Sequence, residues 1–196
     1  MIYNEKVSEH IPEKWSPIEF GSITTFIKGK IPSDDLFPIA INEKYQPYIT
    51  IDVANDASPL YCSAENMVFC NGETIMVMDG AASGDVYIGN YGILGSTFSK
   101  ISSRRSDISD ALLFMYLYTS KSIYKRANTG STVPHANKTY INKMLWVVPE
   151  DCSYYSKVLN NMFSQIENTR KQNAKLHSLR DWLIPMLMNG QATITD

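Results

Sequence analysis

The sequence predicts an α+β fold: a mainly β domain with packed helices over residues 1–150, followed by one long helix over residues 151–196 that can form a coiled coil. Short β-branched and aromatic runs separated by Asn, Gly and Pro fill the first half and are typical of short strands and tight turns. Apolar residues spaced alternately by three and four characterise the C-terminal end and are typical of a paired helix. With 196 residues, 44% of them hydrophobic, the chain can bury one core and carry an appendage.

The N-terminal half is expected to consist mainly of strands. Residues 1–14 are polar and predict a loose lead-in. Residues 26–33 predict a strand that runs into a loop at Gly29, where the backbone can approach another group closely. Further strands are expected at residues 48–53, 66–70, 74–78 and 85–88. The glycines of the turn at residues 79–84 lack the spacing of a nucleotide-binding loop, and a plain β-turn is the simpler interpretation.

A first helix is predicted to start at residues 106–110, where capping and acidic side chains precede an apolar face, and to end near Ala127. Basic residues in its last turn suit the helix dipole without any ligand. Residues 128–138 form a loop rich in hydroxyl and amide groups. That composition suits phosphate and base-edge hydrogen bonds, and equally any exposed loop. The apolar run at residues 144–149, closed by a proline, predicts a last strand.

The C-terminal helix is predicted over residues 154–184, roughly 45 Å at 1.5 Å per residue. Pro185 should end or kink it, and Asn189-Gly190 is a suitable C-terminal stop. Its alternating spacing predicts a seam against another long helix, and the alternative is an amphipathic helix folded onto its own domain. The seam residues are Leu159, Met162, Ile166, Thr169, Asn173, Leu176, Arg180, Leu183 and Leu187.

The net charge of −2 is unevenly distributed along the chain. Residues 1–97 hold 5 Lys/Arg and 13 Asp/Glu, residues 98–148 hold 8 and 2, and residues 149–196 hold 5 and 5, which gives −8, +6 and 0. A local basic block is typical of nucleic-acid binding, although the dipole of a surface helix explains part of it.

Three cysteines, with no export signal, argue against a disulfide framework, and no CxxC or nearby His pair suggests zinc. We therefore expect no metal and no cofactor. No apolar run approaches 18 residues, so the sequence predicts a cytoplasmic protein with no membrane partner.

Five groups of residues carry a family resemblance through their order along the chain. They are Ile11-Pro12-Glu13-Lys14-Trp15 with Phe20-Gly21-Ser22-Ile23; Gly29 with Pro32 and Ser33; residues 75–84 with Val86-Tyr87-Ile88-Gly89 and Gly95-Ser96-Thr97; Thr129-Gly130-Ser131-Thr132 through Val147-Val148-Pro149; and Asn173-Ala174-Lys175-Leu176 with residues 179–185 and 187–190. In this order they resemble the target-recognition half of a type I restriction-modification specificity subunit.

The resemblance implies a subunit that reads one half of a bipartite duplex DNA target. Adenine methylation would come from modification subunits that bind S-adenosylmethionine, and cleavage from an ATP-driven restriction subunit. The sequence shows no methyl-donor motif, no Asn/Asp-Pro-Pro-aromatic motif, no Walker loop and no nuclease pattern, which agrees with a non-catalytic role. A base that is methylated must be flipped into a methyltransferase pocket, and this chain would select that base.

A full specificity subunit of this family has two recognition domains and two long helices, whereas this chain has one of each. It therefore resembles a half-subunit, a fragment, or one segment of a recombining set. A homodimer through the C-terminal helix would supply the second helix, with Leu159, Met162, Ile166, Thr169, Asn173, Leu176, Leu183 and Leu187 as its contacts.

For such a subunit, Lys and Arg anchor phosphates while other side chains read base edges. The expected anchors are Lys28, Lys30, Arg104, Arg105 and Lys138, and the expected readers are Ser131, Thr132, His135 and Asn137. Two other classes remain open. One is a coiled-coil interaction or scaffold protein without sequence-specific DNA binding. The other is an enzyme using Asp34-Asp35, or Asp79 with Asp85, as paired carboxylates, although turns are rich in Asp anyway.

Overall fold

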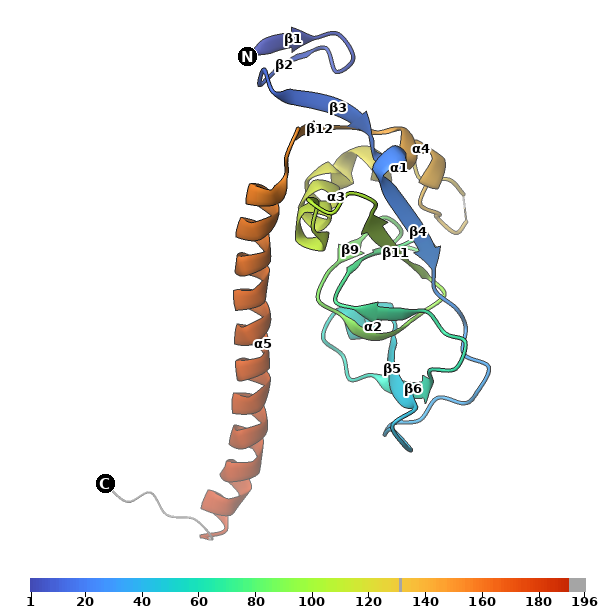
Figure 1. Cartoon of the computed structure of the whole chain (residues 1–196). Helices are drawn as coiled ribbons and strands as arrows, with labels where there is room; N and C mark the ends of the chain where they lie inside the picture. The colour runs from blue at the N-terminus through green and yellow to red at the C-terminus, as the bar shows by residue number, and fades with distance from the viewer. Residues whose placement is uncertain (131, 191–196) are drawn as a thin grey trace, which may run out of the picture. The chain divides into compact units, whose positions relative to one another are not determined.

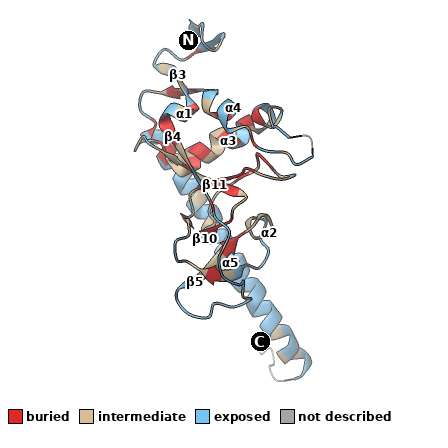
Figure 2. Cartoon of the chain, turned by 90° about the vertical axis from the view of Figure 1, so that its right-hand side faces the viewer, coloured by how far each residue is buried: buried red, intermediate tan, exposed pale blue. Residues whose placement is uncertain are grey.

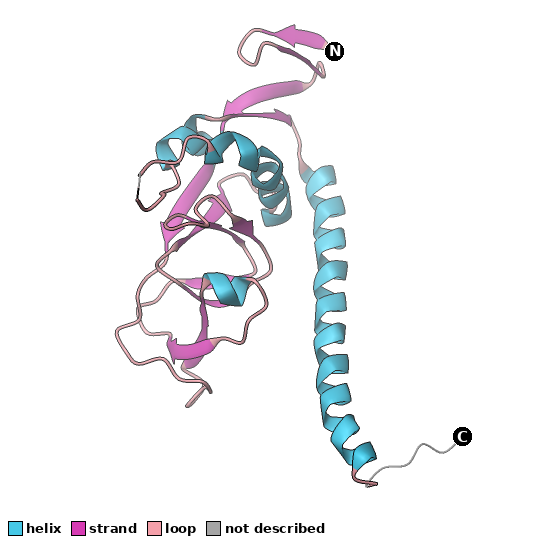
Figure 3. Ribbon diagram, turned by 180° about the vertical axis from the view of Figure 1, so that it is seen from behind, coloured by secondary structure: helices cyan, strands magenta, loops and turns pink. Residues whose placement is uncertain are grey.

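The computed structural model describes residues 1–130 and 132–190. The chain divides into two compact units, Met1–Leu159 and Asn160–Asp196. Every strand lies in the first unit, and the second continues a single helix (Figures 1 and 3). A mainly β domain followed by one long helix confirms the predicted fold class.

One sheet of the first unit has four antiparallel strands in the order β4-β11-β8-β9. They are β4 (Thr24–Lys28), β11 (Phe98–Ser103), β8 (Thr74–Val77) and β9 (Val86–Tyr87). All four residues of β8 are buried, which confirms the strand predicted there from its continuous β-branched and apolar run. The turn between β8 and β9 bonds to itself, with Ser83 N donating to Gly80 O and Gly84 N donating to Val77 O.

The second sheet follows the order β6-β5-β10-β7 and contains the only parallel pair within the described strands, β5 with β10. Its strands are β6 (Leu60–Ser63), β5 (Tyr45–Ile49), β10 (Tyr91–Leu94) and β7 (Phe69–Asn71). The short helix α2 (Ile51–Ala54) follows β5, and its N-cap Thr50 accepts a hydrogen bond from Val53 N. A Thr cap directly after a strand favours this helical turn over continued strand.

Gly29 joins the two sheets. Its N–H donates to Phe98 O at 2.9 Å, and the next N–H, that of Lys30, donates to Leu94 O at 3.2 Å. A Cβ built on Gly29 would lie 2.1 Å from Gly95 O, so no side chain fits there. The close approach that the sequence predicts at Gly29 is therefore made to the backbone of this chain.

A long-range pair of strands closes the first unit. Strand β3 (Trp15–Glu19) pairs antiparallel with β12 (Leu145–Pro149), and α1 (Phe20–Ile23) follows β3 directly. Before them lies a hairpin of β1 (Ile2–Asn4) and β2 (Glu9–Ile11).

The main core gathers around α3 (Asp110–Lys125), whose N-cap Ser109 accepts a hydrogen bond from Leu112 N. Leu113, Leu117 and Tyr124 on its buried face are fully enclosed. Figure 2 shows red, buried segments on α3. Tyr124 satisfies its buried hydroxyl by donating to Gly84 O at 3.0 Å. Helix α4 (Lys138–Lys143) adds Ile141 to the same core.

Helix α5 (Ser153–Met188) has 36 residues, about 54 Å at 1.5 Å per residue. Within it only Ser156 is buried, and its apolar side chains are exposed or half-buried along its length (Figure 2). The described residues contain no helix with the length and apolar composition needed to cross a membrane.

Three local predictions differ from the structure. The loose lead-in contains the β1–β2 hairpin, and residues 51–54 are helical instead of strand. The loop predicted through residue 138 ends one residue earlier, where α4 begins behind its cap Asn137. Pro185, predicted to end or kink α5, does not end it, since the helix continues to Met188. The predicted stop is confirmed beyond it, since Gly190 has φ +67° and its N–H bonds to Leu187 O.

An ion pair fastens the β11–α3 turn to the junction between β12 and α5. Arg105 donates to Asp107 through Nε at 3.0 Å and Nη2 at 2.5 Å, and the same Nη2 donates to Glu150 O. Asp107 Oδ2 also accepts from Cys152 N at 2.9 Å, and its carbonyl accepts from Ser156 Oγ at 2.6 Å. These contacts hold the start of α5 in the first unit.

The Asp107 pair should make stability pH-dependent. Hydrogen bonds from Arg105, with a further one from Cys152 N, lower the pKa of Asp107 to about 2. A lowered pKa contributes stability above the unfolded value of about 4, and that contribution is lost as pH falls toward 2. We expect Asp107→Asn to lower the free energy of unfolding by about 2 kcal/mol at pH 7, and the difference from wild type to vanish near pH 2.

Urea unfolding at pH 7, 4, 3 and 2 measures this difference. Asp35→Asn, which removes an exposed carboxylate, is the matched control and should change stability by less than about 0.5 kcal/mol at each pH. A difference between wild type and Asp107→Asn that stays constant down to pH 2 would contradict the assignment.

Candidate nucleic-acid interface

The structure divides the basic block between internal ion pairs and exposed cations. Four of its eight basic residues are held by carboxylates: Lys100, Arg105, Lys121 and Lys125. Lys100 Nζ lies 2.8 Å from Glu73 Oε1, and the two helical lysines both reach Asp85 Oδ1, at 2.5 and 2.6 Å. Partial burial raises the pKa of Asp85, but hydrogen bonds from these lysines outweigh it and hold that pKa below its ordinary value. Half of the block therefore stabilises the fold.

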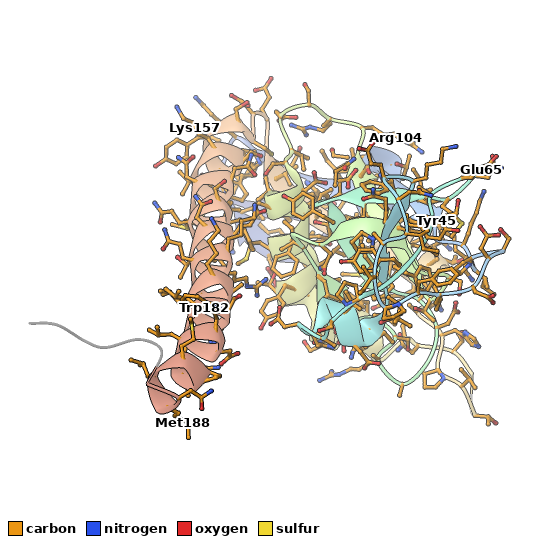
Figure 4. The ribbon with its side chains drawn as sticks, turned by 90° about the horizontal axis from the view of Figure 1, so that it is seen from below. Tyr45, Glu65, Arg104, Lys157, Trp182 and Met188 are labelled. Atoms are coloured by element: carbon orange, nitrogen blue, oxygen red, sulfur yellow. The ribbon has the colours of Figure 1, made fainter. Side chains whose placement is uncertain are left out.

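The other four basic residues of the block make no ion pair with a described carboxylate: Arg104, Arg126, Lys138 and Lys143. Each has an exposed side chain. Arg104 contacts Ser22 O through Nη1 at 3.4 Å and stands at the surface of the first unit in Figure 4. The sequence analysis proposed Arg104 and Lys138 among these four as phosphate anchors and did not propose Arg126 or Lys143.

Two side chains from distant parts of the sequence meet around the carboxylate of Asp79, and we name Lys28, Asp79 and His135 the Asp79 cluster. Lys28 at the end of β4 places Nζ 3.1 Å from Asp79 Oδ2. His135 places Nδ1 2.8 Å from Asp79 Oδ1. Partial burial raises the pKa of Asp79, but hydrogen bonds from His135 and Lys28 outweigh it and hold that pKa below its ordinary value. The carboxylate of Asp79 thus binds two candidate DNA-binding residues, Lys28 and His135.

The loop that carries His135 is closed by backbone bonds of its own and fastened to the β8–β9 region at Pro134 and Ala136. Thr129 and His135 exchange backbone hydrogen bonds of 2.9 and 2.7 Å, and Gly130 takes φ +89° between them. Ala136 N donates to Met78 O, and Gly80 N donates to Pro134 O. These bonds on both sides of His135 fix it beside Asp79.

The other three predicted base readers lie in different settings. Thr132 is exposed on this loop, and Ser131 lies outside the described residues. Asn137 caps α4, because its Oδ1 accepts from Tyr140 N at 3.0 Å, so that oxygen is already used locally.

Lys138, in the first turn of α4, extends over the ring of Phe26 with Nζ 5.2 Å from the ring centroid. Phe26 and Lys28 are two residues apart on β4, so their side chains point to the same face of that strand. Lys138 and the Asp79 cluster therefore share one face, which carries three cationic or titratable groups and one carboxylate. A cation over an aromatic ring keeps its charge available at the outer side.

Lys30 and Arg105 lie outside this grouping. Lys30 Nζ donates to Asn66 O at 2.6 Å in the loop before β7. Arg105 is committed to Asp107 and Glu150, which gives it a structural role and speaks against its use as a phosphate anchor. The structure thus joins Lys28, His135 and Lys138, and leaves Lys30, Arg104 and Arg105 elsewhere.

Sequence reasoning considered Asp79 only as a possible catalytic carboxylate and overlooked Phe26. The carboxylates once paired as catalytic candidates, Asp79 and Asp85, bind cations on different elements. No signal along the chain links Asp79 to His135, 56 residues away. The alternation of Phe26 and Lys28 on one predicted strand could have placed an aromatic ring beside a lysine.

Comparisons with known proteins bear on this surface. Residues 12–177 match the family described as type I restriction modification DNA specificity domain. The type I restriction enzyme MjaVIII specificity subunit of Methanocaldococcus jannaschii is 25% identical over 193 residues, which is 94% of this chain and 44% of the relative.

Solved structures show the same fold. The S subunit of a type I restriction-modification system from M. genitalium superposes with a TM-score of 0.65 and 13% identity, over 88% of this chain and 45% of that one. The HsdS subunit from Thermoanaerobacter tengcongensis gives a TM-score of 0.57 and 14% identity, over 91% and 45%. The chain spans less than half the length of these relatives. Because the family match covers most of its residues, the chain belongs to the type I restriction-modification DNA specificity domain family.

Proposed function

We propose that this chain is a DNA sequence-recognition subunit of a type I restriction-modification complex. It reads one half of a bipartite duplex target and positions adenine-methyltransferase and restriction subunits. The family match over residues 12–177 carries this proposal. Residues 1–150 read DNA, and residues 151–196 dock partner subunits and a second copy of the chain. The complex works on DNA in the cytoplasm, and this chain is not itself an enzyme.

The chemistry of such a complex lies with its partners. Methylation and cleavage need a bound methyl donor and a nucleotide-driven motor, and this sequence carries no motif for either. The part left to this chain is to hold the register between its own contacts and the base that a partner flips. A coiled-coil scaffold without DNA binding would account for α5 alone, whereas the family match extends over the β unit as well.

The Asp79 cluster and Lys138 support phosphate binding at this face. Lys28 is 63% exposed in its side chain, and an exposed ion pair is worth only about 0.2–1 kcal/mol. A phosphate can therefore replace Asp79 as the partner of Lys28 at little cost. Asp79 meanwhile weakens the attraction of this face for any polyanion, which limits sequence-blind binding.

Base reading falls to the exposed part of the same loop. Thr132 offers a hydroxyl donor and acceptor, and His135 offers a ring nitrogen beyond the one at Asp79. Backbone bonds of Pro134 and Ala136 to the β8–β9 region hold His135 in a fixed place on this loop. Fixed placement is needed because base edges are read by geometry.

The proposed function predicts that specificity appears in the complex. With modification subunits bound, we expect this chain to bind its target duplex about 10³-fold or more tightly than a scrambled duplex. The target is obtained by sequencing adenine methylation in cells that express the system. Fluorescence anisotropy at several salt concentrations measures both affinities. Equal affinity for target and scrambled duplexes in the complex would refute the reading role.

Anchors and readers should separate in this assay. We expect Lys138→Ala to weaken binding equally to target and scrambled duplexes and to reduce the salt slope by about 0.9, because one phosphate contact is lost. Thr132→Ala should weaken target binding by about 1–3 kcal/mol and leave scrambled binding unchanged. Lys44, an exposed lysine directly before β5 of the second sheet, provides the matched control. Lys44→Ala should change neither the affinity for either duplex nor the salt slope. A Lys138→Ala effect confined to the target would contradict its role as an anchor.

The competing role of Asp79 is testable by charge removal. Asp79→Asn keeps a hydrogen-bond acceptor for Lys28 and His135 but removes the negative charge. We expect it to raise affinity for scrambled duplex roughly two- to fivefold at low salt, in line with the small energy of an exposed pair. Asp35→Asn changes the net charge equally and serves as the control. Equal effects of the two variants would show that only net charge matters and would remove the special role of Asp79.

A further inference from the structure

Large aliphatic side chains are exposed on the loop between β4 and β5 and on the neighbouring strand β6. Ile31 and Ile39 are each 76% exposed, although a folded chain gains free energy by burying such side chains. Single exposed aliphatic residues are common, whereas several gathered on one surface mark a contact with another molecule. We name the five exposed aliphatic residues of this region the β6-edge surface: Ile31, Leu36, Ile39, Ile41 and Leu60.

The first part of the loop runs beside β6. Phe37 N donates to Tyr61 O at 2.9 Å, and Tyr61 N donates to Phe37 O at 2.7 Å. The ring of Phe37 also contacts the ring of Tyr45 on β5, with centroids 5.7 Å apart. Leu36 directly precedes Phe37, and Leu60 directly precedes Tyr61. This bridge therefore brings the two leucines to the same edge of the second sheet.

The second part of the loop returns to the same strand. Ala64, directly after β6, donates its backbone N–H to Lys44 O at 2.9 Å. Residues 38–43 thus form a short loop that is fastened beside β6 at both ends. Ile39 and Ile41 lie on this short loop, so they belong to the same edge as the two leucines.

The start of the loop is held at the second sheet as well. Tyr48 Oη donates to Lys30 O at 3.3 Å, and Lys30 Nζ donates to Asn66 O at 2.6 Å. Ile31 follows Lys30 directly. The β6-edge surface is therefore fixed by hydrogen bonds along the loop, and β5 and β6 lie at the end of the first unit opposite the β1–β2 hairpin (Figure 1).

The surroundings of this surface are acidic. Residues 29–66 hold six carboxylates and two lysines, which gives a net charge of −4. All six carboxylates are exposed, and none makes an ion pair with a described cation. Figure 4 shows one of them, Glu65, at the outside of the first unit. The six are Asp34, Asp35, Glu43, Asp52, Asp56 and Glu65.

We propose that the β6-edge surface binds a basic, apolar segment of a partner protein. Apolar side chains of the segment pack on Ile31, Ile39 and Leu60, and its lysines or arginines pair with the surrounding carboxylates. This inference goes beyond the proposed function, which assigns partner docking to residues 151–196 and base reading to the loop that carries His135.

Charge complementarity selects this occupant. A DNA phosphate would face six carboxylates at the β6-edge surface, whereas it meets Lys28 and Lys138 at the face of the Asp79 cluster. Two identical copies of the surface would repel each other through the same carboxylates. An apolar segment without cations would leave those carboxylates partly dehydrated and unpaired. A basic, apolar segment satisfies both the aliphatic and the acidic part of the surface.

Peptide binding by the full chain tests the inference. The probe is a fluorescent amphipathic peptide of leucine and lysine, and a peptide with glutamate in place of lysine is its matched control. Fluorescence anisotropy should show saturable binding of the lysine peptide and no binding of the glutamate peptide. Ile31→Ser with Ile39→Ser should weaken binding about tenfold or more, because two aliphatic side chains lose their burial in the contact. Ile123→Ser, an exposed isoleucine on α3, should leave binding unchanged.

The carboxylates give a second readout. Asp34→Asn with Glu65→Gln should weaken binding of the lysine peptide roughly threefold and reduce its dependence on salt, because two exposed ion pairs are lost. Glu9→Gln with Glu13→Gln, near the N-terminal hairpin, removes the same charge from the other end of the first unit and is the control. Equal weakening by both pairs would show that only net charge matters and would overturn the inference.

Thiol labelling locates the bound peptide. Ile39→Cys should react with a maleimide about tenfold more slowly when the lysine peptide saturates the chain, because the contact covers this side chain. Ser122→Cys on the exposed face of α3 should react at the same rate with and without peptide. Wild type, whose Cys62, Cys70 and Cys152 are buried, gives the background. Unchanged labelling of Ile39→Cys would place the peptide elsewhere and overturn the inference.

The double variant Ile31→Ser with Ile39→Ser also tests the other occupants. Weaker binding of scrambled duplex by the chain alone at low salt would assign the surface to DNA. Loss of self-association in sedimentation would assign it to a second copy of the chain. Either result overturns the inference, as does equal binding of the lysine and glutamate peptides by wild type. Target-specific DNA binding by the complex is measured separately, so the proposed function stands or falls independently.

Discussion

The pairing of β3 with β12 is the constraint on which the first unit depends. It joins Trp15 to Pro149 across more than a hundred residues, so everything between is closed into one unit. Trp146 on β12 stacks on Tyr116 of α3 with ring centroids 4.5 Å apart, which ties the strand pair to the main core. The Arg105–Asp107 pair then fixes the chain where α5 begins. The position at which the long helix leaves the unit is thus set by strand register and one charged contact.

Exposure separates the ion pairs of the basic residues into buried and exchangeable ones. Asp85 holds two lysines of α3 and is only 24% exposed in its side chain, so exchanging it for a phosphate would leave a poorly hydrated carboxylate. Asp79 holds Lys28, whose side chain is 63% exposed against 37% and 32% for the two lysines at Asp85, and water replaces that contact easily. The same ion-pair chemistry therefore stabilises the fold at α3 and stays exchangeable at β4. The number of lysines and arginines along the sequence cannot distinguish structural ion pairs from exchangeable ones.

Signals within a few residues of sequence were sufficient to predict the elements that depend on near neighbours. The apolar run of β8, the Ser109 cap of α3 and the three-four spacing of α5 all predicted their elements, because each depends on neighbours within a few residues. Helix α4 was missed because six residues give little periodicity and its cap, Asn137, also suits a loop. The Asp79 cluster could not be predicted, since strand order brings its residues together. The seam predicted a partner helix without identifying it, because apolar spacing is the same for any partner.

The composition of the seam balances stability against uniqueness. Nine leucines in its place would bury more apolar surface, yet they would pair equally well in parallel, antiparallel and shifted alignments. Polar side chains on the seam, Thr169 and Asn173, would penalise every alignment that sets them against leucine. In the proposed dimer, a two-fold axis would relate two identical reading units, and such a dimer would read two inverted copies of one half-site. A chain with two different recognition domains reads two unrelated half-sites, so the symmetry of the target follows from whether the second helix comes from the same chain.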